Sequence, residues 1–296
     1  MNQETVVGNP QTTNDAPPEK KKKRAICSRC QRPAERACIC AALPHSRISL
    51  QKCELVILQH PQELKRKNRS LPLVELCMAQ DDIHTVVARR FGTQVDSHVM
   101  DLIKNEHRNV MLVYPSDDAK SLTEGLRQIC ERNTAGNDDK TTIVFLDATW
   151  RFVKQMYKAN ESLFPKNVIK VALKQEDWSL FIKKSEFKPA RFDIRTPPSP
   201  NHLSTAECIA WIISTIENDP SHYDTIMKPL DLMVEQWHSF SGRGTFSFTN
   251  GDGSIDEATQ DDKRSKGRKR KKGSTLLGMT LRLGTLEKVH ENVIVL

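Results

Sequence analysis

From about residue 50 onward, short apolar runs alternate along the chain with segments of helical periodicity. Four of these runs are seven residues long and almost uninterrupted in their apolar character: 53–59 (CELVILQ), 109–115 (NVMLVYP), 141–147 (TTIVFLD) and 167–173 (NVIKVAL). A fifth segment, 83–91 (IHTVVARRF), is also strand-like in composition. Continuous apolar runs of this length are typical of strands that are buried on both faces of a parallel sheet. We therefore predict strands at these five places.

Helical spacing of apolar positions fills the intervals between these runs. The predicted helices cover 71–79, 150–159, 208–217 and 228–240. Two helix starts carry the capping-box pattern, Ser121 with Glu124 and Ser204 with Glu207, and the first of them opens a helix that ends near Glu131. Strands that alternate with helices predict an α/β fold, with a mostly parallel sheet and helices on both faces.

Polar or rigid groups stand where three of the predicted strands end: QHP at 59–61, YPS at 114–116 and DATW at 147–150. Parallel strands bring their carboxyl ends to one edge of the sheet, and this edge is where ligands bind in such folds. The sequence therefore predicts a site around Asp147. The residues alone leave two interpretations of this carboxylate, because an aspartate before a helix is either an N-cap or part of an active site.

Four cysteines lie within 14 residues near the start of the chain: Cys27-x2-Cys30 and Cys38-x-Cys40. Two closely spaced thiolate pairs suit the tetrahedral geometry of a structural zinc ion. The surrounding segment has almost no apolar core of its own, so this knuckle is predicted to need the metal in order to fold. A redox-active pair is the main alternative. The other four cysteines occur singly in apolar segments and are interpreted as core residues: Cys53, Cys77, Cys130 and Cys208.

The formal net charge of +8 is concentrated outside the predicted fold. The run 20–24 contributes five positive charges and 263–272 contributes eight, whereas 25–250 carries 30 basic against 27 acidic residues. Such basic arms bind polyanions by counterion release, serve as nuclear import signals, or only keep the protein in solution. The arginines interleaved with the cysteines, Arg29, Arg32 and Arg36, suggest a nucleic-acid-facing side on the knuckle.

These patterns divide the chain into four parts. We predict a disordered basic arm over 1–24, the zinc knuckle over 25–44, the α/β domain with the candidate site over 45–245 and a mostly disordered basic tail over 246–296. No run of about 18 apolar residues is present, which argues against a membrane span. The polar N-terminal segment also has no apolar signal-peptide core. We therefore expect an intracellular protein of the nucleus or cytoplasm.

Five sequence blocks in a fixed order resemble the DTW-domain family. They are C-x2-C…C-x-C, LQHPQE, YPS, LDATW and FDIRTPP…LSTAE, and together they extend from about Cys27 to Phe240. Bacterial members often carry an Asn-Thr pair shortly after the H-P-x-E block, where this chain has Asn68-Arg69-Ser70. Glycine-rich phosphate loops of the forms GxGxxG and GxxxxGK[ST] are absent, which argues against nucleoside triphosphate and Rossmann dehydrogenase chemistry.

The resemblance implies a fold, an activity and a partner. Members of the family are tRNA-uridine aminocarboxypropyltransferases, with a SPOUT-like fold and a relationship to ribosomal RNA aminocarboxypropyltransferases. They transfer the 3-amino-3-carboxypropyl group of S-adenosylmethionine (SAM) to the 3-position ring nitrogen of a tRNA uridine, and methylthioadenosine is released. The chain is therefore expected to use SAM as group donor and tRNA as substrate.

The same resemblance assigns expected roles to residues of this chain. Asp147 would serve as the base for the uracil N–H or would orient the uracil. Thr149 would form a hydrogen bond with the uracil or the donor, and Trp150 would stack on the uracil or form a wall of the SAM pocket. The expected SAM-binding residues are Pro115, Leu146, Arg195, Ser204, Thr205 and Glu207, with a tRNA phosphate as the alternative partner of Arg195. The expected tRNA-binding residues are His60, Glu63 and Arg69.

Two other functions fit part of these observations. One is a SAM-dependent RNA methyltransferase on the same SPOUT-like fold, which would release S-adenosylhomocysteine. The other is a zinc-containing adaptor that binds RNA without catalysis and does not bind SAM.

Overall fold

The computed structural model describes residues 24–92, 97–133, 140–174, 177, 191–194, 203–241 and 293–294. The two predicted arms, 1–24 and 246–296, therefore lie almost entirely outside the described residues, and Arg195 lies outside them as well.

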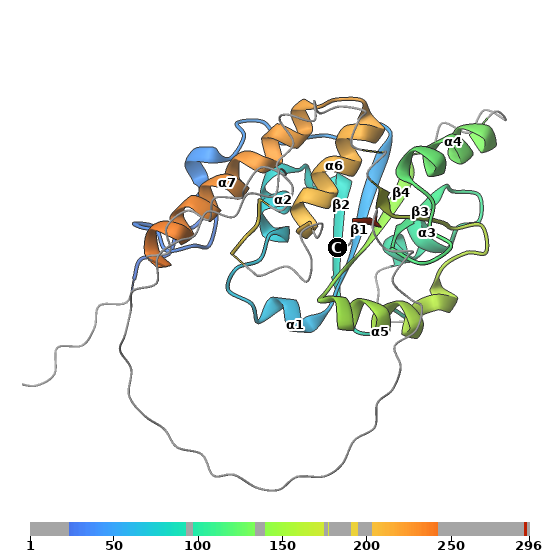
Figure 1. Ribbon diagram of the computed structural model, residues 1–296, viewed down its shortest axis with the longest axis horizontal. Coiled ribbons are helices and arrows are strands. Elements are labelled where there is room, and N and C mark those ends of the chain that lie inside the picture. Colours follow the sequence, from blue (N-terminus) through green and yellow to red (C-terminus); the bar gives the residue numbers. More distant parts are fainter. Residues whose placement is uncertain are drawn as a thin grey trace, which may run out of the picture.

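A five-stranded parallel sheet forms the centre of the fold and confirms the prediction from the apolar runs (Figure 1). The strand order is β2-β1-β4-β3-β5, and every neighbouring pair is parallel. The strands are β1 (Cys53–Gln59), β2 (Ile83–Val87), β3 (Val110–Val113), β4 (Thr141–Asp147) and β5 (Ile169–Val171). A separate antiparallel pairing joins β6 (Leu173–Lys174) to β7 (Val293–Ile294).

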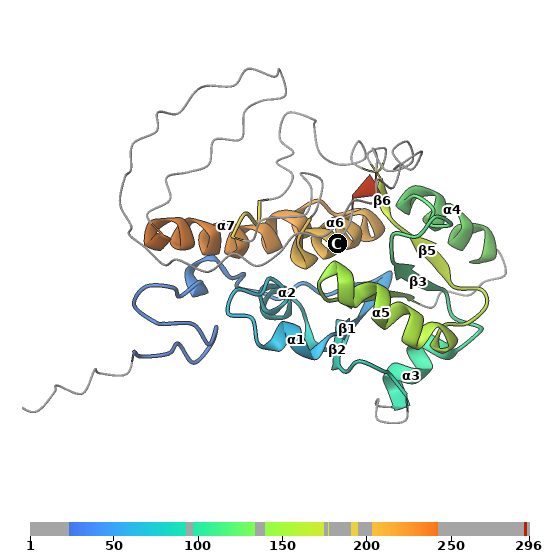
Figure 2. The same cartoon turned by 60° about the horizontal axis from the view of Figure 1, so that its bottom comes forward.

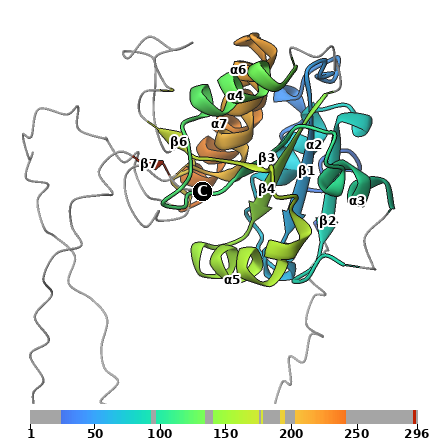
Figure 3. The same cartoon turned by 90° about the vertical axis from the view of Figure 1, so that its right-hand side faces the viewer.

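Helices cover both faces of the sheet, as predicted (Figures 2 and 3). One face packs against α2 (Leu71–Cys77), α4 (Leu122–Arg132), α6 (Thr205–Glu217) and α7 (Ser221–Ser241). The other face packs against α3 (Ser97–Lys104) and α5 (Trp150–Asn160). The short α1 (Pro61–Leu64) follows β1, and single 3-10 turns occur at Cys40–Ala42, Gln80–Asp82 and Glu161–Leu163. None of the helices in the described ranges is long and apolar enough to cross a membrane.

Successive residues of the central strands belong to different cores. On β1, Leu55 and Ile57 join the core beneath α6 and α7, while Val56 and Leu58 join the core beneath α3 and α5. All four side chains are fully buried. This burial on both faces explains why the strand is continuously apolar rather than alternating.

The chain changes direction between the two central strands. The strand that follows β1 in the chain, β2, lies beside it at one edge of the sheet. The strand that follows β4 in the chain, β5, lies beyond β3 at the other edge. The carboxyl ends of β1 and β4 lie side by side there, with Gln59 in register with Asp147. Ligands of parallel α/β sheets bind beyond such switch points. The topology therefore places a candidate site at Asp147.

The predicted start of the last helix at residue 228 is wrong, because α7 begins at Ser221 and contains Pro229. Proline has no backbone N–H, so its presence leaves the carbonyl of Thr225 without the usual helical donor. The Cys77 thiol lies 3.8 Å from that carbonyl oxygen and donates to it. A neighbouring helix thus compensates for the proline, which local sequence patterns do not reveal.

Other local predictions also need correction. Cys130 is exposed on the outer side of α4 and is not a core residue, whereas Cys53, Cys77 and Cys208 are buried. The Ser121 hydroxyl caps α4 as predicted, by accepting from the backbone N–H of Glu124. The Glu124 carboxylate, however, pairs with Arg127 instead of completing the capping box.

We expect Gly125→Ala to destabilise the fold, because α4 approaches the sheet closely at Gly125. A Cβ atom there would lie 2.6 Å from Cγ1 of Val171 and 3.3 Å from Cε of Met111. Overpacking of this kind typically costs about 1–3 kcal/mol. The free energy of unfolding in urea measures the loss. Gly92→Ala is the matched control, since a Cβ at Gly92 has no atom within 4 Å, and equal stability losses in both variants would contradict the account.

Candidate functional site

Asp147 is the last residue of β4, and both of its carboxylate oxygens have defined donors. Oδ1 accepts a 2.6 Å hydrogen bond from the Thr205 hydroxyl, and Oδ2 accepts a 2.6 Å hydrogen bond from Nε2 of Gln59. The side chain is buried, at 8% exposure. Each carboxylate oxygen has a second lone pair, so this arrangement fixes the direction of the carboxylate and leaves each oxygen able to accept one further donor.

The interpretation of Asp147 as an N-cap is wrong. The N-cap of α5 is Thr149, whose backbone carbonyl accepts from Phe152 and Val153. The Thr149 side chain makes no capping hydrogen bond, so capping does not occupy its hydroxyl. Trp150 is the first residue of α5, and its side chain lies outside the described part of the structure.

His60 connects the ends of the two central strands. Its backbone N–H donates to the carbonyl of Asp147 at 2.9 Å, and its Nδ1 accepts from the backbone N–H of Gln62 at 3.1 Å as the N-cap of α1. The ring stacks on Phe152 of α5, with centroids 4.3 Å apart. Burial lowers the pKa of His60, and Arg89 lowers it further. The ring is therefore neutral near pH 7, and an accepting Nδ1 requires that Nε2 carries the proton.

The first turn of α6 faces Asp147 and contains the predicted capping box. The Ser204 hydroxyl accepts from the N–H of Glu207 at 3.3 Å, and Oε2 of Glu207 accepts from the N–H of Ser204 at 2.7 Å. Oε1 of Glu207 accepts from the backbone N–H of Arg191 at 2.7 Å. Burial raises the pKa of this carboxyl group. Ser204 and Glu207 therefore have structural roles in this turn, and Thr205 is the member whose side chain reaches Asp147.

The remaining predicted residues are placed differently. Leu146 is 1% exposed and packs in the core beneath α3 and α5, because alternation along β4 directs it away from the Asp147 side. Its side chain is therefore not available to a ligand. Glu63 is buried and forms an ion pair with Arg66 at 3.0 Å. Pro115 is half-buried and follows β3 at the same edge of the sheet. Arg69 lines a cleft beside the zinc knuckle.

Three residues of the site were absent from the predicted set. Gln59 and Phe152 contact Asp147 and His60 as described above, and the Ser70 hydroxyl accepts a 3.4 Å hydrogen bond from the N–H of Ala206 in the first turn of α6. Gln59 had a recognisable signal, because it is a polar residue at the last position of an apolar strand. Ser70 had only the signal of the family block, because it lies where bacterial members carry an Asn-Thr pair. Phe152 had none, since its partner His60 is distant in the sequence.

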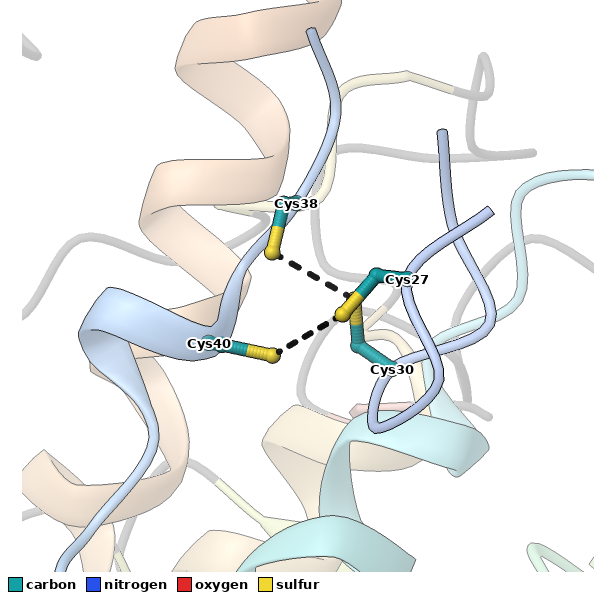
Figure 4. A group of neighbouring side chains, drawn as sticks. All are labelled: Cys27, Cys30, Cys38 and Cys40. Atoms are coloured by element: carbon teal, nitrogen blue, oxygen red, sulfur yellow. Dashed lines mark hydrogen bonds between the residues drawn. The ribbon is translucent and has the colours of Figure 1, made fainter. Parts of the chain in front are cut away.

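The four predicted zinc ligands do converge (Figure 4). The sulfur atoms of Cys27 and Cys40 lie 3.5 Å apart, those of Cys30 and Cys38 lie 3.8 Å apart, and all four lie within 4.8 Å of one another. Tetrahedral zinc with Zn–S bonds of about 2.3 Å requires sulfur atoms about 3.8 Å apart. The cluster therefore fits a four-thiolate zinc site.

The knuckle is attached to α7. Arg32 donates to the carbonyl of Ala37 at 2.8 Å and contacts Sδ of Met233 at 2.9 Å. The amide of Gln236 donates to the carbonyl of Cys38 at 2.9 Å. Arg32, one of the three arginines expected to form a nucleic-acid-facing side, is therefore directed inward and holds the knuckle against the helix.

Comparisons with known proteins agree on one family. A family profile described as the DTW domain matches residues 24–238. The chain is 29% identical over 219 residues to "tRNA-uridine aminocarboxypropyltransferase 2" of Macaca fascicularis, a match that covers 74% of this chain and 65% of that protein. It is 28% identical over 220 residues to the protein of that name from Drosophila melanogaster, covering 74% and 76%.

A plant relative extends the comparison. The chain is 28% identical over 203 residues to "tRNA-uridine aminocarboxypropyltransferase A" of Arabidopsis thaliana, covering 67% of this chain and 74% of that protein. The chain spans just under two thirds of the length of the macaque relative. No solved structure matches the chain, so the SPOUT-like relationship stays a prediction.

Proposed function

The chain belongs to the DTW domain family, and we propose that it is a tRNA-uridine aminocarboxypropyltransferase. Its reaction would attach the 3-amino-3-carboxypropyl group of SAM to the 3-position ring nitrogen of a uridine in tRNA. The observation that carries the proposal is the buried Asp147 carboxylate at the switch point of the sheet, oriented by Gln59 and Thr205, within the range that the family profile matches. A tRNA substrate is also the basis for expecting an intracellular location, in the nucleus or cytoplasm.

The proposed chemistry requires a proton acceptor at a fixed position. The uracil nitrogen between the two carbonyls carries a proton and is a poor nucleophile until that proton is removed. Asp147 would accept the N–H hydrogen bond through a remaining lone pair and take the proton as the N–C bond forms. SAM, when bound, supplies a carbon activated by its sulfonium, and the C–S bond breaks to release methylthioadenosine. Transfer of the longer chain rather than the methyl group depends on orientation, which the protein provides.

The neighbouring side chains support this role for Asp147. Thr205 and Gln59 hold the carboxylate in one direction. We assign a uracil or donor contact to the Thr149 hydroxyl, which capping does not occupy. Trp150 would stack on the uracil, because stacking on an unpaired base is the usual mode of RNA recognition. The stacking of His60 on Phe152 holds the start of α1 against α5 beside Asp147.

We assign the carboxylate of the donor to the first turn of α6. The N-terminus of this 13-residue helix favours an anion through its backbone N–H groups. Ser204 and Glu207 would act there by shaping the turn, since their side chains are used in the capping box. Pro115 would border the donor at the end of β3, and Arg195 keeps its proposed contact with the donor carboxylate or a tRNA phosphate.

The zinc site is assigned a structural role. Four thiolates complete a tetrahedral shell and leave no open position for a substrate. The contacts of the knuckle with Met233 and Gln236 of α7 make it part of the catalytic body. Loss of the metal is therefore expected to act through folding rather than through chemistry.

The by-product of the reaction separates this proposal from its alternatives. Purified protein is incubated with tRNA and SAM, and the small-molecule products are identified by mass spectrometry. We expect methylthioadenosine in amounts that depend on tRNA. S-adenosylhomocysteine instead would indicate a methyltransferase, and tRNA binding without consumption of SAM would indicate an adaptor.

A further inference from the structure

A cleft of about 390 Å³ lies between the zinc knuckle and α2. The charged residues that line it are strongly unequal in sign. Five are basic and one is acidic: Arg29, Arg32, Arg47, Lys67, Arg69 and Glu75. A concave surface lined by one sign of charge focuses the electrostatic field and attracts ions of the opposite sign.

Most of this positive charge is not neutralised by the protein. The Glu75 carboxylate accepts from the Thr85 hydroxyl at 2.7 Å. Within the described part of the chain, no ion pair is formed by Arg47, Lys67 or Arg69. Arg47 and Lys67 are exposed, and Arg69 is half-buried. These three cations are therefore available to an anion from outside.

Neutralisation of the negative charge of the zinc site accounts for only one of the five basic residues. Four thiolates around one zinc ion carry a net negative charge, which nearby arginines stabilise. Arg32 fulfils this role, because its half-buried guanidinium interacts electrostatically with Cys30 and Cys38. Arg29 makes only a long contact of 3.4 Å, with the carbonyl of Pro44. The zinc site therefore explains Arg32 and leaves the charge of the other four unexplained.

The cleft lies next to the candidate active site. Arg69 directly precedes Ser70, and the Ser70 hydroxyl accepts from the N–H of Ala206 in the first turn of α6. The preceding residue of that turn, Thr205, donates to Asp147. A polynucleotide whose base is at Asp147 can thus continue along Arg69 into the cleft and reach the knuckle.

We propose that this cleft binds consecutive phosphates of the tRNA backbone beside the uridine that is modified. The inference rests on the proposed function, because it takes tRNA as the occupant. Arginine is suited to phosphate through its planar fork of donors, and a lysine adds a point charge. The zinc knuckle would then contribute to substrate binding by fixing Arg29 and one wall of the cleft.

The double variant Arg47→Gln/Lys67→Gln tests the proposal, with Lys104→Gln as a control for the same lysine change. Lys104 is an exposed residue of α3 on the opposite face of the sheet. The Kd for tRNA is measured by fluorescence anisotropy over a range of salt concentrations. Two lost phosphate contacts should raise the Kd roughly tenfold near physiological salt and reduce the slope of log Kd against log salt by about 1.5. The control should match the wild type.

Zinc content and SAM binding show whether the double variant is folded, and both should equal those of the wild type. A double variant with wild-type Kd and salt slope would overturn the cleft proposal, while tRNA modification by the wild type would leave the proposed function standing. An equally large loss of tRNA affinity in Lys104→Gln would also overturn the cleft proposal, because removal of any surface lysine would then weaken binding. Failure of the wild type to bind tRNA would overturn both proposals.

Discussion

Replacement of Asp147 by asparagine is expected to lower the rate of aminocarboxypropyl transfer by about 10²- to 10⁴-fold, which is the range for loss of a positioned proton acceptor. Asparagine has nearly the same shape but cannot take the uracil proton. Gln59 and Thr205 both donate to the carboxylate in the wild type. The asparagine amide would place its own N–H₂ donor opposite one of these two donors. The fold and the zinc site should persist, because Asp147 is not the helix cap. Single-turnover rates with saturating tRNA and SAM measure the effect.

Two further variants control this experiment. Asp101→Asn makes the same chemical change at an exposed position on α3 and should leave the rate unchanged. Thr205→Val removes the donor to Oδ1 and should lower the rate by about tenfold, the equivalent of one hydrogen bond, with recovery in Thr205→Ser. A fully active Asp147→Asn enzyme would remove this carboxylate from the mechanism.

Replacement of Cys38 by serine is expected to abolish stoichiometric zinc binding and to destabilise the protein. A serine hydroxyl is a poor substitute for one of four thiolates, and structural zinc contributes about 10–16 kcal/mol of binding free energy in small zinc domains. The damage should spread to α7, because Gln236 donates to the carbonyl of Cys38. Zinc per chain is measured by mass spectrometry of the metal, and thermal unfolding measures stability.

Cys130→Ser is the matched control for this change. Cys130 is a free and exposed thiol on α4, far from the cluster in sequence. It should retain one zinc per chain and the thermal stability of the wild type. Equal zinc content in the Cys38 and Cys130 variants would contradict the four-thiolate assignment.

Local sequence patterns were sufficient to predict the sheet and the capping of α6. The strands are buried on both faces, so their apolar character is visible without knowledge of their neighbours. The Ser204 and Glu207 capping box joins residues that are three positions apart. The convergence of the four cysteines was also predictable, since all four lie within one short segment.

Contacts between distant segments could not be predicted in the same way. The hydrogen bond from Gln59 to Asp147 depends on the pairing of β1 with β4, which the pattern of neither strand specifies. The inward direction of Arg32 depends on Met233, 201 residues away. The thiol that compensates for Pro229 inside α7 comes from Cys77 of α2, 148 residues away from Thr225. Each of these features is determined by packing rather than by local propensity.

Transfer of the labelled side chain of SAM to tRNA tests the central claim most directly. The purified protein is incubated with tRNA and SAM labelled in its carboxyl group, and the tRNA is then digested and its nucleosides are separated. We predict that the label appears in a uridine modified at the 3-position nitrogen, together with an equal amount of methylthioadenosine. The absence of label from every tRNA, under conditions in which SAM and tRNA both bind, would contradict the account.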